Sequence, residues 1–473
     1  MIRSIHHSTL RQASCLLLLP CFGSLALTLS SCAPVGPDYK QPEILVPSDY
    51  KFKTVKNGEK AATREQWWKV FNDSKLNAII NDVRTSNQEI RASYARYQQS
   101  RSNLKATTAK SKPTLSFSPS IQHEGSSGEL NDDRYTHTVT RIPINSSWEL
   151  DLFGSIKRQT EASVADSQVA AEELNNLRLT LEADAAIRYF RLRSIDKEIA
   201  IVKEEIKGRE DTLLVIEDRF SVGSVSKLDV SRAKSELAIT RANLTDLHRS
   251  RSTEEAAIAL LCGKPASNYS IAYSPLVSSV PRIPSSLPSE LLRSRPDIRA
   301  AERQVAGANA RIGVATAAFY PSISLTGNVG TASASLNTRF SRRSSIWSIG
   351  PEVYLPIFGG GGNKAALSFS KARYEEVLAN YQQAVLLAIS EVETRLSATQ
   401  ELNRKATAQS DAVTAAREAR LIAKEQYNGG VTNYLSILDA ERTAFDIERS
   451  RAQTLGAEYI NTVNLIRALG GRW

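Results

Sequence analysis

The stretch YNGGVTNYLSILDAE, residues 427–441, has a double glycine, a short polar run, and a leucine-rich segment that contains one aspartate, Asp439, set among apolar residues as if buried. About 200 residues earlier, FSVGSVSKLDVSRAK, residues 220–234, follows the same plan. Glycine accepts the positive φ that commonly ends a helix, and each glycine here is followed by the pattern of a new helix. Both stretches are therefore predicted to be the turns of helical hairpins.

Outward from the two turns, further landmarks recur at a nearly constant offset. KPTLSFSPS from Lys112 matches YPSISLTGN from Tyr320 at an offset of 208, and VGSVSKL from Val222 matches GGVTNYL from Gly429 at 207. LDLFGS matches LPIFGG at 205. The identity is low, but the order of the proline, Phe-Gly and glycine landmarks is the same. The sequence therefore predicts a two-fold internal repeat.

Each repeat is expected to contain a helix of about 25 residues, two strands, a very long helix, the glycine turn, and a helix of about 36 residues. Gly208 is the only glycine or proline between Ser155 and Val222, and none occurs in residues 363–428. Helices near 65 residues, about 100 Å long, need an unusual architecture, since the average is about 11–12 residues. Apolar residues seven apart predict coiled-coil packing. They are Leu192, Ile199, Ile206, Leu213 and Phe220 in the first long helix, and Leu438, Phe445, Ala452, Tyr459 and Ile466 in the last helix.

Four runs of about ten residues alternate between apolar and polar side chains, as strands that cross a bilayer do. Two of them are residues 113–122 and residues 344–358. The expected apolar faces are Leu115, Phe117 and Ile121; Ile142, Ile144, Trp148, Leu150 and Leu152; Ile323, Leu325 and Val329; and Trp347, Ile349, Val353, Leu355 and Ile357. A soluble sandwich is the alternative, but four strands make one poorly. Four strands also cannot close a barrel, so several chains are expected to contribute, and three chains would supply twelve.

The first 31 residues have the features of an export signal, with Arg3 and Arg11 ahead of the apolar run ASCLLLLPCFGSLALTL. The end of this segment, LSSC, resembles the lipobox of bacterial lipoproteins, which implies that Cys32 carries a diacylglyceryl group and that two or three acyl chains anchor the mature protein. A plain signal peptide with a chance cysteine is the alternative. No apolar run of 18 or more residues follows, so no helical membrane span is predicted in the mature chain.

The composition argues against several other classes of function. The net charge of +10 is spread over 473 residues with interleaved signs, which favours a solvated surface over a nucleic-acid footprint. After the signal segment and Cys32, Cys262 is the only cysteine, so no internal disulfide is expected. His123, His137 and His248 lack metal-ligand spacing, and no catalytic constellation is discernible. No enzyme activity, metal or cofactor is predicted.

Several stretches together resemble one known family. They are CAPVGPDYKQP, WWKVFNDSKLNAII, SWELDLFGSIKR, GPEVYLPIFGGG and LLRSRPDIRAAERQVAGANARIGVATAAFYPSISLTG. They are similar to the outer membrane efflux (TolC-like) proteins, in particular the lipoprotein branch that serves tripartite pumps. The resemblance implies a mainly α-helical homotrimer whose 12-strand β-barrel in the outer membrane of a Gram-negative-type bacterium continues into a 12-helix α-barrel tunnel.

The resemblance also implies a passive exit duct that is coupled to an inner-membrane transporter through a periplasmic adaptor. Its adaptor-facing tips would be Val222, Gly223 and Ser224, and Gly429, Gly430 and Val431. The family's second hairpin often has two carboxylates at the periplasmic gate. Here those positions are Ser436 and Asp439, so a doubled anionic ring is not expected, and Asp229 is a further candidate.

Two simpler alternatives remain for these residues. Asp229 and Asp439 can be helix-start carboxylates that serve as caps, and the turns can reverse the chain without binding a partner. For the whole protein, the alternative to a duct is a structural or adhesive coiled-coil lipoprotein of the outer membrane without transport activity.

The predicted division of the chain follows from the signal and the repeat. It comprises residues 1–31 as a lipoprotein signal peptide, 32–85 as a lipid-anchored linker with a short helix, 86–263 as the first repeat, 264–294 as a linker, and 295–473 as the second repeat.

Overall fold

The computed structural model describes residues 34–52, 66–125, 136–276, 280–283 and 288–471. The predicted signal peptide and Cys32 lie outside the described residues. The chain forms two compact units. Unit 1 comprises Met1–Pro42, Gln99–Gln168 and Glu302–Ala379, and unit 2 comprises Glu43–Gln98, Val169–Ala301 and Asn380–Trp473. Each unit is described by itself below.

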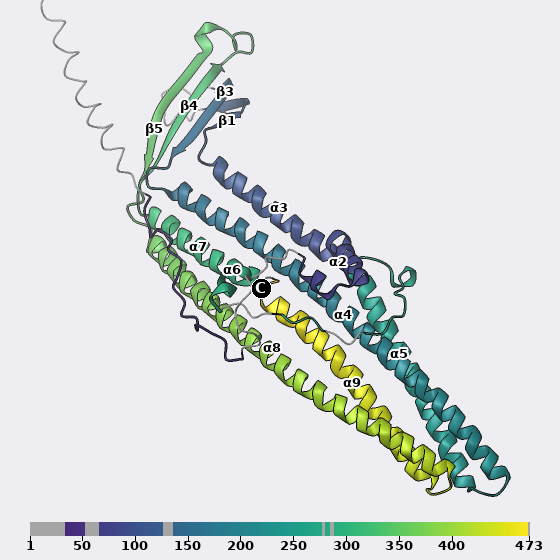
Figure 1. Cartoon of the computed structure of the whole chain (residues 1–473). Helices are drawn as coiled ribbons and strands as arrows, with labels where there is room; N and C mark the ends of the chain where they lie inside the picture. The colour runs from purple at the N-terminus through teal and green to yellow at the C-terminus, as the bar shows by residue number, and fades with distance from the viewer. Residues whose placement is uncertain (1–33, 53–65, 126–135, 277–279, 284–287, 472–473) are drawn as a thin grey trace, which may run out of the picture. The chain divides into compact units, whose positions relative to one another are not determined.

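Figure 1 labels the main helices and four of the five strands, β2 being the one without a label. The helices are α2 (Ser74–Ser86), α3 (Gln88–Ala109), α4 (Ser155–Ser221), α5 (Lys227–Leu261), α6 (Leu291–Ser294), α7 (Pro296–Ala317), α8 (Gly362–Asn428) and α9 (Tyr434–Ala468). Short 3-10 helices are η2 (Trp67–Phe71), η3 (Ala266–Asn268), η4 (Pro288–Glu290) and η5 (Arg342–Ser344). The strands are β1 (Thr114–Phe117), β2 (Ser120–Gly125), β3 (Thr136–Leu150), β4 (Ser322–Ser333) and β5 (Ser345–Tyr354).

The helices come in pairs of equal length. α4 and α8 have 67 residues each, α5 and α9 have 35 each, and α3 and α7 have 22 each. The two very long helices predicted from the lack of glycine and proline are confirmed. The first helix of each predicted repeat is shorter than the expected 25 residues, because α3 and α7 each end four residues before a proline, Pro113 or Pro321.

Unit 1 contains an antiparallel sheet in the order β1–β3–β4–β5, with β2 following β1 along the same side of β3. The register places Phe117, Ile144, Val329 and Trp347 in one row across the sheet. The adjacent row is polar and contains Ser116, Asn145, Asn328 and Ser348. Since side chains alternate along a strand, the sheet has one apolar and one polar face, as the alternating pattern predicts.

The apolar face of the sheet is open in the single chain. Trp347 is 75% exposed, and Leu115, Phe117, Ile349 and Val353 are also exposed. On the polar face, the Asn328 amide donates to the Ser348 hydroxyl at 2.8 Å. An exposed apolar surface of this size marks contact with lipid or protein, because water solvates it poorly.

Two details of the predicted strands are wrong. The first run, residues 113–122, is not one strand: it is interrupted at Ser118 and Pro119, where proline has no N–H to donate to β3. The ends of two other runs also leave the sheet, since Leu152, Leu355 and Ile357 lie beyond the last residues of β3 and β5.

Unit 2 is held by helix packing and an aromatic cluster. The ring centroids of Phe190 and Phe71 are 4.7 Å apart, and those of Phe190 and Tyr459 are also 4.7 Å apart. These contacts join η2, α4 and α9. Around them, Trp67 and Trp68 are buried. The stretch WWKVF therefore forms a short helix, η2, whose aromatic side chains pack against α4 and α9.

The predicted heptad positions differ between the two helices. All five positions of α9, from Leu438 to Ile466, are buried. In α4 the seam is buried at Leu192 and Ile199, but Phe220 is 40% exposed and Ile216 is buried instead. A straight α-helix drifts by about 20° per heptad against a strict seven-residue repeat, so the buried face moves to neighbouring positions over the length of α4.

No helix among the described residues is both long enough and apolar enough to cross a membrane.

Candidate functional site

The first predicted tip is the turn between α4 and α5 in unit 2. Gly223 has φ +76°, and its N–H donates to the Phe220 carbonyl at 3.0 Å. The next N–H, of Ser224, donates to the Arg219 carbonyl at 2.8 Å. This pair of bonds satisfies carbonyls at the end of the helix, and it needs a residue that tolerates positive φ. Val222 is exposed at this turn.

The second predicted tip, between α8 and α9 in unit 2, has the same geometry. Gly430 has φ +73° and donates to the Tyr427 carbonyl at 3.0 Å, while the Val431 N–H donates to the Gln426 carbonyl at 2.8 Å. Gly429 does not have a positive φ; its N–H continues the helical pattern by donating to the Glu425 carbonyl at 2.9 Å. Val431 is exposed.

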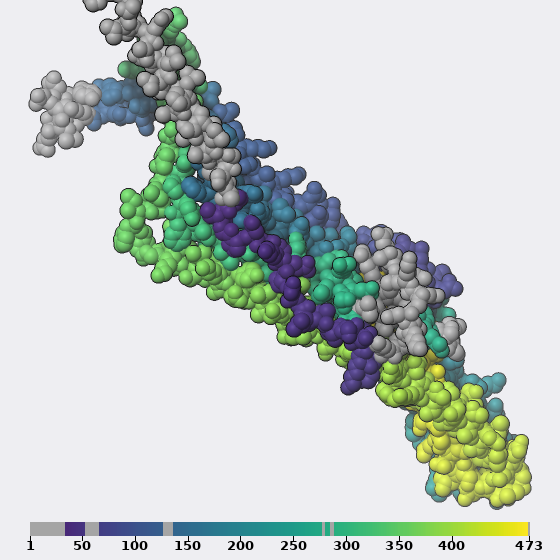
Figure 2. Space-filling model, turned by 60° about the vertical axis from the view of Figure 1, so that its left-hand side comes forward, coloured from purple at the N-terminus to yellow at the C-terminus, as the bar shows by residue number. Residues whose placement is uncertain are grey.

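The two turns pack together. A single apolar cluster contains Ile216, Val230, Tyr427, Tyr434, Ile437 and Leu438. Arg219 of α4 also crosses to the end of α8, where it donates to the carbonyls of Tyr427 at 3.0 Å and Asn428 at 3.1 Å. Its guanidinium lies 4.5 Å from the centroid of the Tyr427 ring. The two turns therefore form one end of unit 2, and Figure 2 shows the α8–α9 part of it in yellow-green.

Asp229 has a clear local role. It forms a capping box with Ser226, the residue before α5: the Ser226 N–H and hydroxyl donate to Asp229 at 3.2 and 2.7 Å, and the Asp229 N–H donates to the Ser226 hydroxyl at 3.2 Å. Ser436 has the equivalent position in α9, where its N–H donates to the side chain of Asn433 at 3.2 Å. The carboxylate of Asp229 is thus engaged in holding the start of its helix.

Asp439 lies one turn further along α9. The impression from the sequence that it is buried is wrong: Ile437 and Leu438 are buried in the cluster, and Asp439 is exposed. Among the described residues, no hydrogen bond or ion pair of its carboxylate is found. Asp439 therefore presents a solvated negative charge in the single chain.

A belt of charged side chains, of which Glu205, Arg209 and Glu236 are buried, lies next to the turns, and the sequence analysis did not identify it. Glu236 of α5 accepts from Arg209 of α4 at 2.9 Å and from Arg442 of α9. Arg209 also donates to Glu205 at 2.8 Å. Hydrogen bonding from Arg442 lowers the pKa of Glu236, whereas burial raises the pKa of both Glu205 and Glu441. In the sequence, these residues do not differ from the many solvated charges of the long helices.

A second feature that the sequence analysis missed lies in unit 1, where the N-terminal segment of residues 34–39 packs on α4 and α7. Figure 2 shows the start of the described chain as a purple ridge on the surface. The guanidinium of Arg158, only 4% exposed, donates to the Val35 carbonyl at 3.2 Å, the Gly36 carbonyl at 3.3 Å and the Asp38 carboxylate at 2.7 Å.

Close packing fixes the same segment. Gly36 has φ +90° and lies against the backbone of Gly313, so that a side chain at Gly36 would overlap α7. Further along, the Asn309 amide donates to the Pro37 carbonyl at 2.9 Å. The Val35 N–H donates to the Phe153 carbonyl, just after β3, at 3.1 Å. The stretch CAPVGPDYKQP therefore includes a segment that is bound beside the foot of the sheet.

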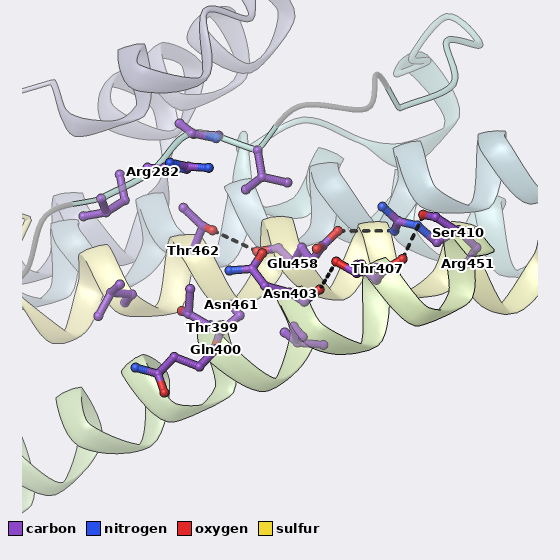
Figure 3. A pocket seen from close by; sticks show the side chains of 16 residues that line it. Arg282, Thr399, Gln400, Asn403, Thr407, Ser410, Arg451, Glu458, Asn461 and Thr462 are labelled. Atoms are coloured by element: carbon purple, nitrogen blue, oxygen red, sulfur yellow. Dashed lines mark hydrogen bonds and ion pairs between the residues drawn. The ribbon is translucent and has the colours of Figure 1, made fainter. Parts of the chain in front are cut away.

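Unit 2 also contains a polar cavity of about 700 Å³ between α8, α9 and residues 280–283 (Figure 3). Arg451 and Glu458 form an ion pair at 3.3 Å, and the Asn461 amide donates to Thr399 at 2.9 Å. Burial raises the pKa of Glu458. Within the described parts of the chain, no group of three or more His, Cys, Asp or Glu residues is arranged to hold a metal ion. The cavity offers a polar surface and no nucleophile–base arrangement.

Comparison with known proteins agrees with this geometry. The family model described as outer membrane efflux protein matches residues 79–264 and 287–471. The cation efflux system protein CusC of Escherichia coli O6:H1 is 31% identical over 465 residues, which are 96% of this chain and 98% of that protein. The probable outer membrane lipoprotein SilC of Salmonella typhimurium is 27% identical over 95% of this chain and 98% of that protein.

A solved structure, the outer-membrane channel OprN, covers 92% of this chain and 99% of its own, at 31% identity and a TM-score of 0.88. These relatives are efflux channel proteins and not enzymes. The chain therefore belongs to the outer membrane efflux protein family, and it acts in the outer membrane as the exit duct of an efflux system.

Proposed function

We propose that three copies of this chain form the duct. Each copy would fill four strand positions of a 12-strand β-barrel and four helix positions of a 12-helix tunnel. The observation that carries this proposal is the sheet of unit 1, which has an exposed apolar face, a polar face and two unpaired edges. Within the described residues, β5 pairs only with β4, and β1 and β2 pair only with β3. Unpaired backbone groups are not tolerated in lipid, so these edges need partners from other copies.

The exposed apolar pairs on the helices support the same assembly. Leu386 and Leu387, and then Leu421 and Ile422, are exposed on α8, and Leu214 and Val215 are exposed on α4. In a water-filled periplasm such pairs are expected to face neighbouring helices, because burying each leucine-sized side chain contributes about 2 kcal/mol. We assign them to contacts between copies.

We also propose that the chain is a two-fold repeat, with residues 86–263 and 295–473 as its halves and residues 264–294 as the linker. The equal lengths of the paired helices support this division, as do Gly223 and Gly430, which close their helices with the same pair of bonds. In this assignment a trimer has six hairpin turns. Residues 32–85 carry the lipid anchor, η2 and α2 except for its last residue, Ser86.

The six turns are proposed as the docking surface for the periplasmic adaptor, which in turn connects the duct to the inner-membrane transporter. Val222, Gly223 and Ser224, and Gly429, Gly430 and Val431, would form this surface. Its support is the exposure of Val222 and Val431 at turns whose backbone bonds are already satisfied. Exposed apolar side chains on a rigid turn are suited to insertion into a partner's groove.

Asp439 is our candidate for the periplasmic gate. Three-fold symmetry would convert its solvated charge into a ring of three carboxylates, which favours cations. Ser436 in the same hairpin supplies no second ring. Asp229 is the weaker candidate, since its carboxylate is engaged in the capping box.

We further propose that Cys32 is acylated and anchors the chain in the inner leaflet of the outer membrane. The binding of residues 34–39 by Arg158 supports this, because it holds the chain beside the foot of the sheet two residues after Cys32. The name of the relative SilC, a probable outer membrane lipoprotein, also agrees with an anchored chain.

The sulfur-containing side chains of the chain bear on how its cargo is selected. CusC is named for cation efflux, and thioether or thiolate ligands select soft cations such as Cu(I). The sequence has one methionine, Met1, and Cys262 is buried. We therefore propose that cargo is selected by the transporter and adaptor and not by ligands in the duct.

Two measurements on the mature, lipidated protein test the assembly. Extraction in mild detergent is expected to give a species of three times the mass of the mature chain, which lacks residues 1–31 of the 52.0 kDa sequence. Reconstitution of this species in a planar bilayer should give single-channel conductance. A monomer that is released intact when its anchor is removed, and that gives no channels, would overturn the proposal.

A further inference from the structure

The loop between β4 and β5, residues 334–344, is strongly basic. Arg339, Arg342 and Arg343 lie within five residues, and no acidic residue occurs between Glu302 and Glu352. Among the described residues, none of the three arginines forms an ion pair. Two large apolar side chains, Leu336 and Phe340, stand exposed in the same loop, and Phe340 is 73% exposed.

The loop has internal structure that keeps these side chains at the surface. The Ser344 hydroxyl donates to the Thr338 carbonyl at 2.7 Å, and Arg339 donates to the Leu336 carbonyl at 2.5 Å. The Arg339 guanidinium also lies 5.1 Å from the centroid of the Phe340 ring. These bonds tie the loop to itself. Arg342, Arg343, Leu336 and Phe340 are left exposed, and Arg339 is half-buried over the Phe340 ring.

The position of the loop within unit 1 follows from the chain path. α7 leads into β4 and β5 leads into α8, so both helices join the same end of the sheet, and the loop lies at the other end (Figure 1). The N-terminal segment that follows Cys32 is bound at the helix end, through Val35 and Phe153. With the anchor in the inner leaflet, as proposed above, the loop lies at the outer leaflet.

We propose that this loop is a binding surface for the phosphorylated headgroup of an outer-leaflet lipid. Guanidinium groups bind phosphate oxygens with paired N–H donors, and their charge attracts an anionic membrane surface. Leu336 and Phe340 contribute apolar contact with the acyl chains, in continuity with the exposed apolar face at Trp347 and Ile349. Charge and hydrophobicity together select a lipid over a free anion. The inference rests on the proposed membrane orientation.

The test uses the mature, lipidated protein in detergent, and bisphosphorylated lipid A as the probe. The triple variant Arg339→Gln, Arg342→Gln, Arg343→Gln removes the basic groups from an exposed loop without changing the strands. We expect a loss of affinity of about fivefold for each arginine and about a hundredfold for all three. The loss should shrink as the salt concentration rises.

A matched control carries the same change of charge elsewhere. Arg249, Arg373 and Arg404 are exposed on the helices, each in a pair with an acid three residues away. Their triple replacement by glutamine should leave lipid A binding unchanged. Dephosphorylated lipid A should bind the wild type about as weakly as lipid A binds the loop variant.

Two outcomes would overturn the inference. One is equal binding of lipid A by the wild type and the loop variant, which would be the result if acids elsewhere neutralise these arginines. The other is displacement of the lipid by an equal concentration of inorganic phosphate, which would assign the loop to a free anion. Single-channel conductance is measured on the same samples: a conducting loop variant with unchanged lipid binding refutes this inference alone, whereas a wild type that does not conduct refutes the proposed duct.

Discussion

Single buried charges set the response of the helical unit to pH. Glu182 of α4 is one of them: its side chain is 6% exposed, it accepts from the indole N–H of Trp67 at 3.2 Å, and it pairs with Arg84 at 3.0 Å. Burial raises its pKa to about 7, and the pairing with Arg84 and Trp67 only partly opposes this effect. Below pH 7 the folded protein therefore favours a neutral Glu182.

The sign of the pH dependence follows directly. The folded pKa lies above the unfolded value, so the stabilisation is complete below about pH 4.5 and is lost as the pH rises through 7. The loss is about 3 kcal/mol for a shift of this size. Glu182→Gln mimics the neutral form, and we expect thermal unfolding between pH 5 and 8 to show a fall in Tm for the wild type and a much smaller fall for the variant.

Glu401→Gln is the control for this experiment, since Glu401 is exposed on α8 and pairs with Arg404 at its surface. It should leave the pH dependence as in the wild type. If Glu182→Gln leaves the slope of Tm against pH unchanged, then Glu182 is ionised in the folded protein throughout this range.

The roles of individual residues were only partly predictable from the sequence. The positive φ of Gly223 and Gly430 follows from their place after a long helix. The capping box of Asp229 was an open alternative, and the choice required the position of Ser226. Arg158 gave no signal at all, because a buried arginine that binds backbone carbonyls looks in the sequence like any other helical arginine.

At the scale of the elements, the second hairpin turn contains two adjacent glycines with different conformations. Gly430 has φ +73° and open space around it, so a Cβ there would add backbone strain alone. Gly429 has no positive φ and a Cβ there would make ordinary contacts. Alanine should therefore be tolerated at Gly429 and destabilising at Gly430.

We expect Gly430→Ala to destabilise the turn by about 1 kcal/mol, and Gly429→Ala to be neutral or slightly stabilising. Hydrogen exchange of the amides in the turn measures this: exchange should be about fivefold faster in the first variant and unchanged or slower in the second. Equal effects of the two substitutions would show that the turn does not depend on the positive φ of Gly430.

The elements themselves were largely predictable, for a physical reason. Residues 363–428 contain no glycine or proline, and α4 contains only Gly208, so neither stretch has a proline at which the helix would break, and α4 and α8 are continuous. The break between β1 and β2 was also visible in principle, because Pro119 cannot donate to the ladder. It was missed because the apolar alternation continues through it from Phe117 to Ile121.

For the whole molecule, an assembly of several copies is favoured because several surfaces of the single chain have no partner. The apolar face of the sheet, the two open edges and the exposed pairs on α4 and α8 all lack partners within the described chain. The heptad pattern could not predict that the buried face of α4 moves to neighbouring positions along the helix and leaves Phe220 exposed. That drift depends on the pitch of a straight helix over many turns and not on any single heptad.

The gate is a property of the assembled duct, and its test is ion selectivity. In a trimer, Asp439→Asn removes three solvated charges without changing the shape of the side chain, so the ratio of cation to anion permeability in a planar bilayer should fall roughly twofold or more. Asp229→Asn removes the same number of charges from the neighbouring hairpin, but its carboxylate caps α5. That control should loosen the turn, seen as faster hydrogen exchange near Ser226, with the selectivity unchanged. If Asp229→Asn alters the selectivity and Asp439→Asn does not, the solvated carboxylate of α9 is not the gate, and the capping residue of α5 lines the pore.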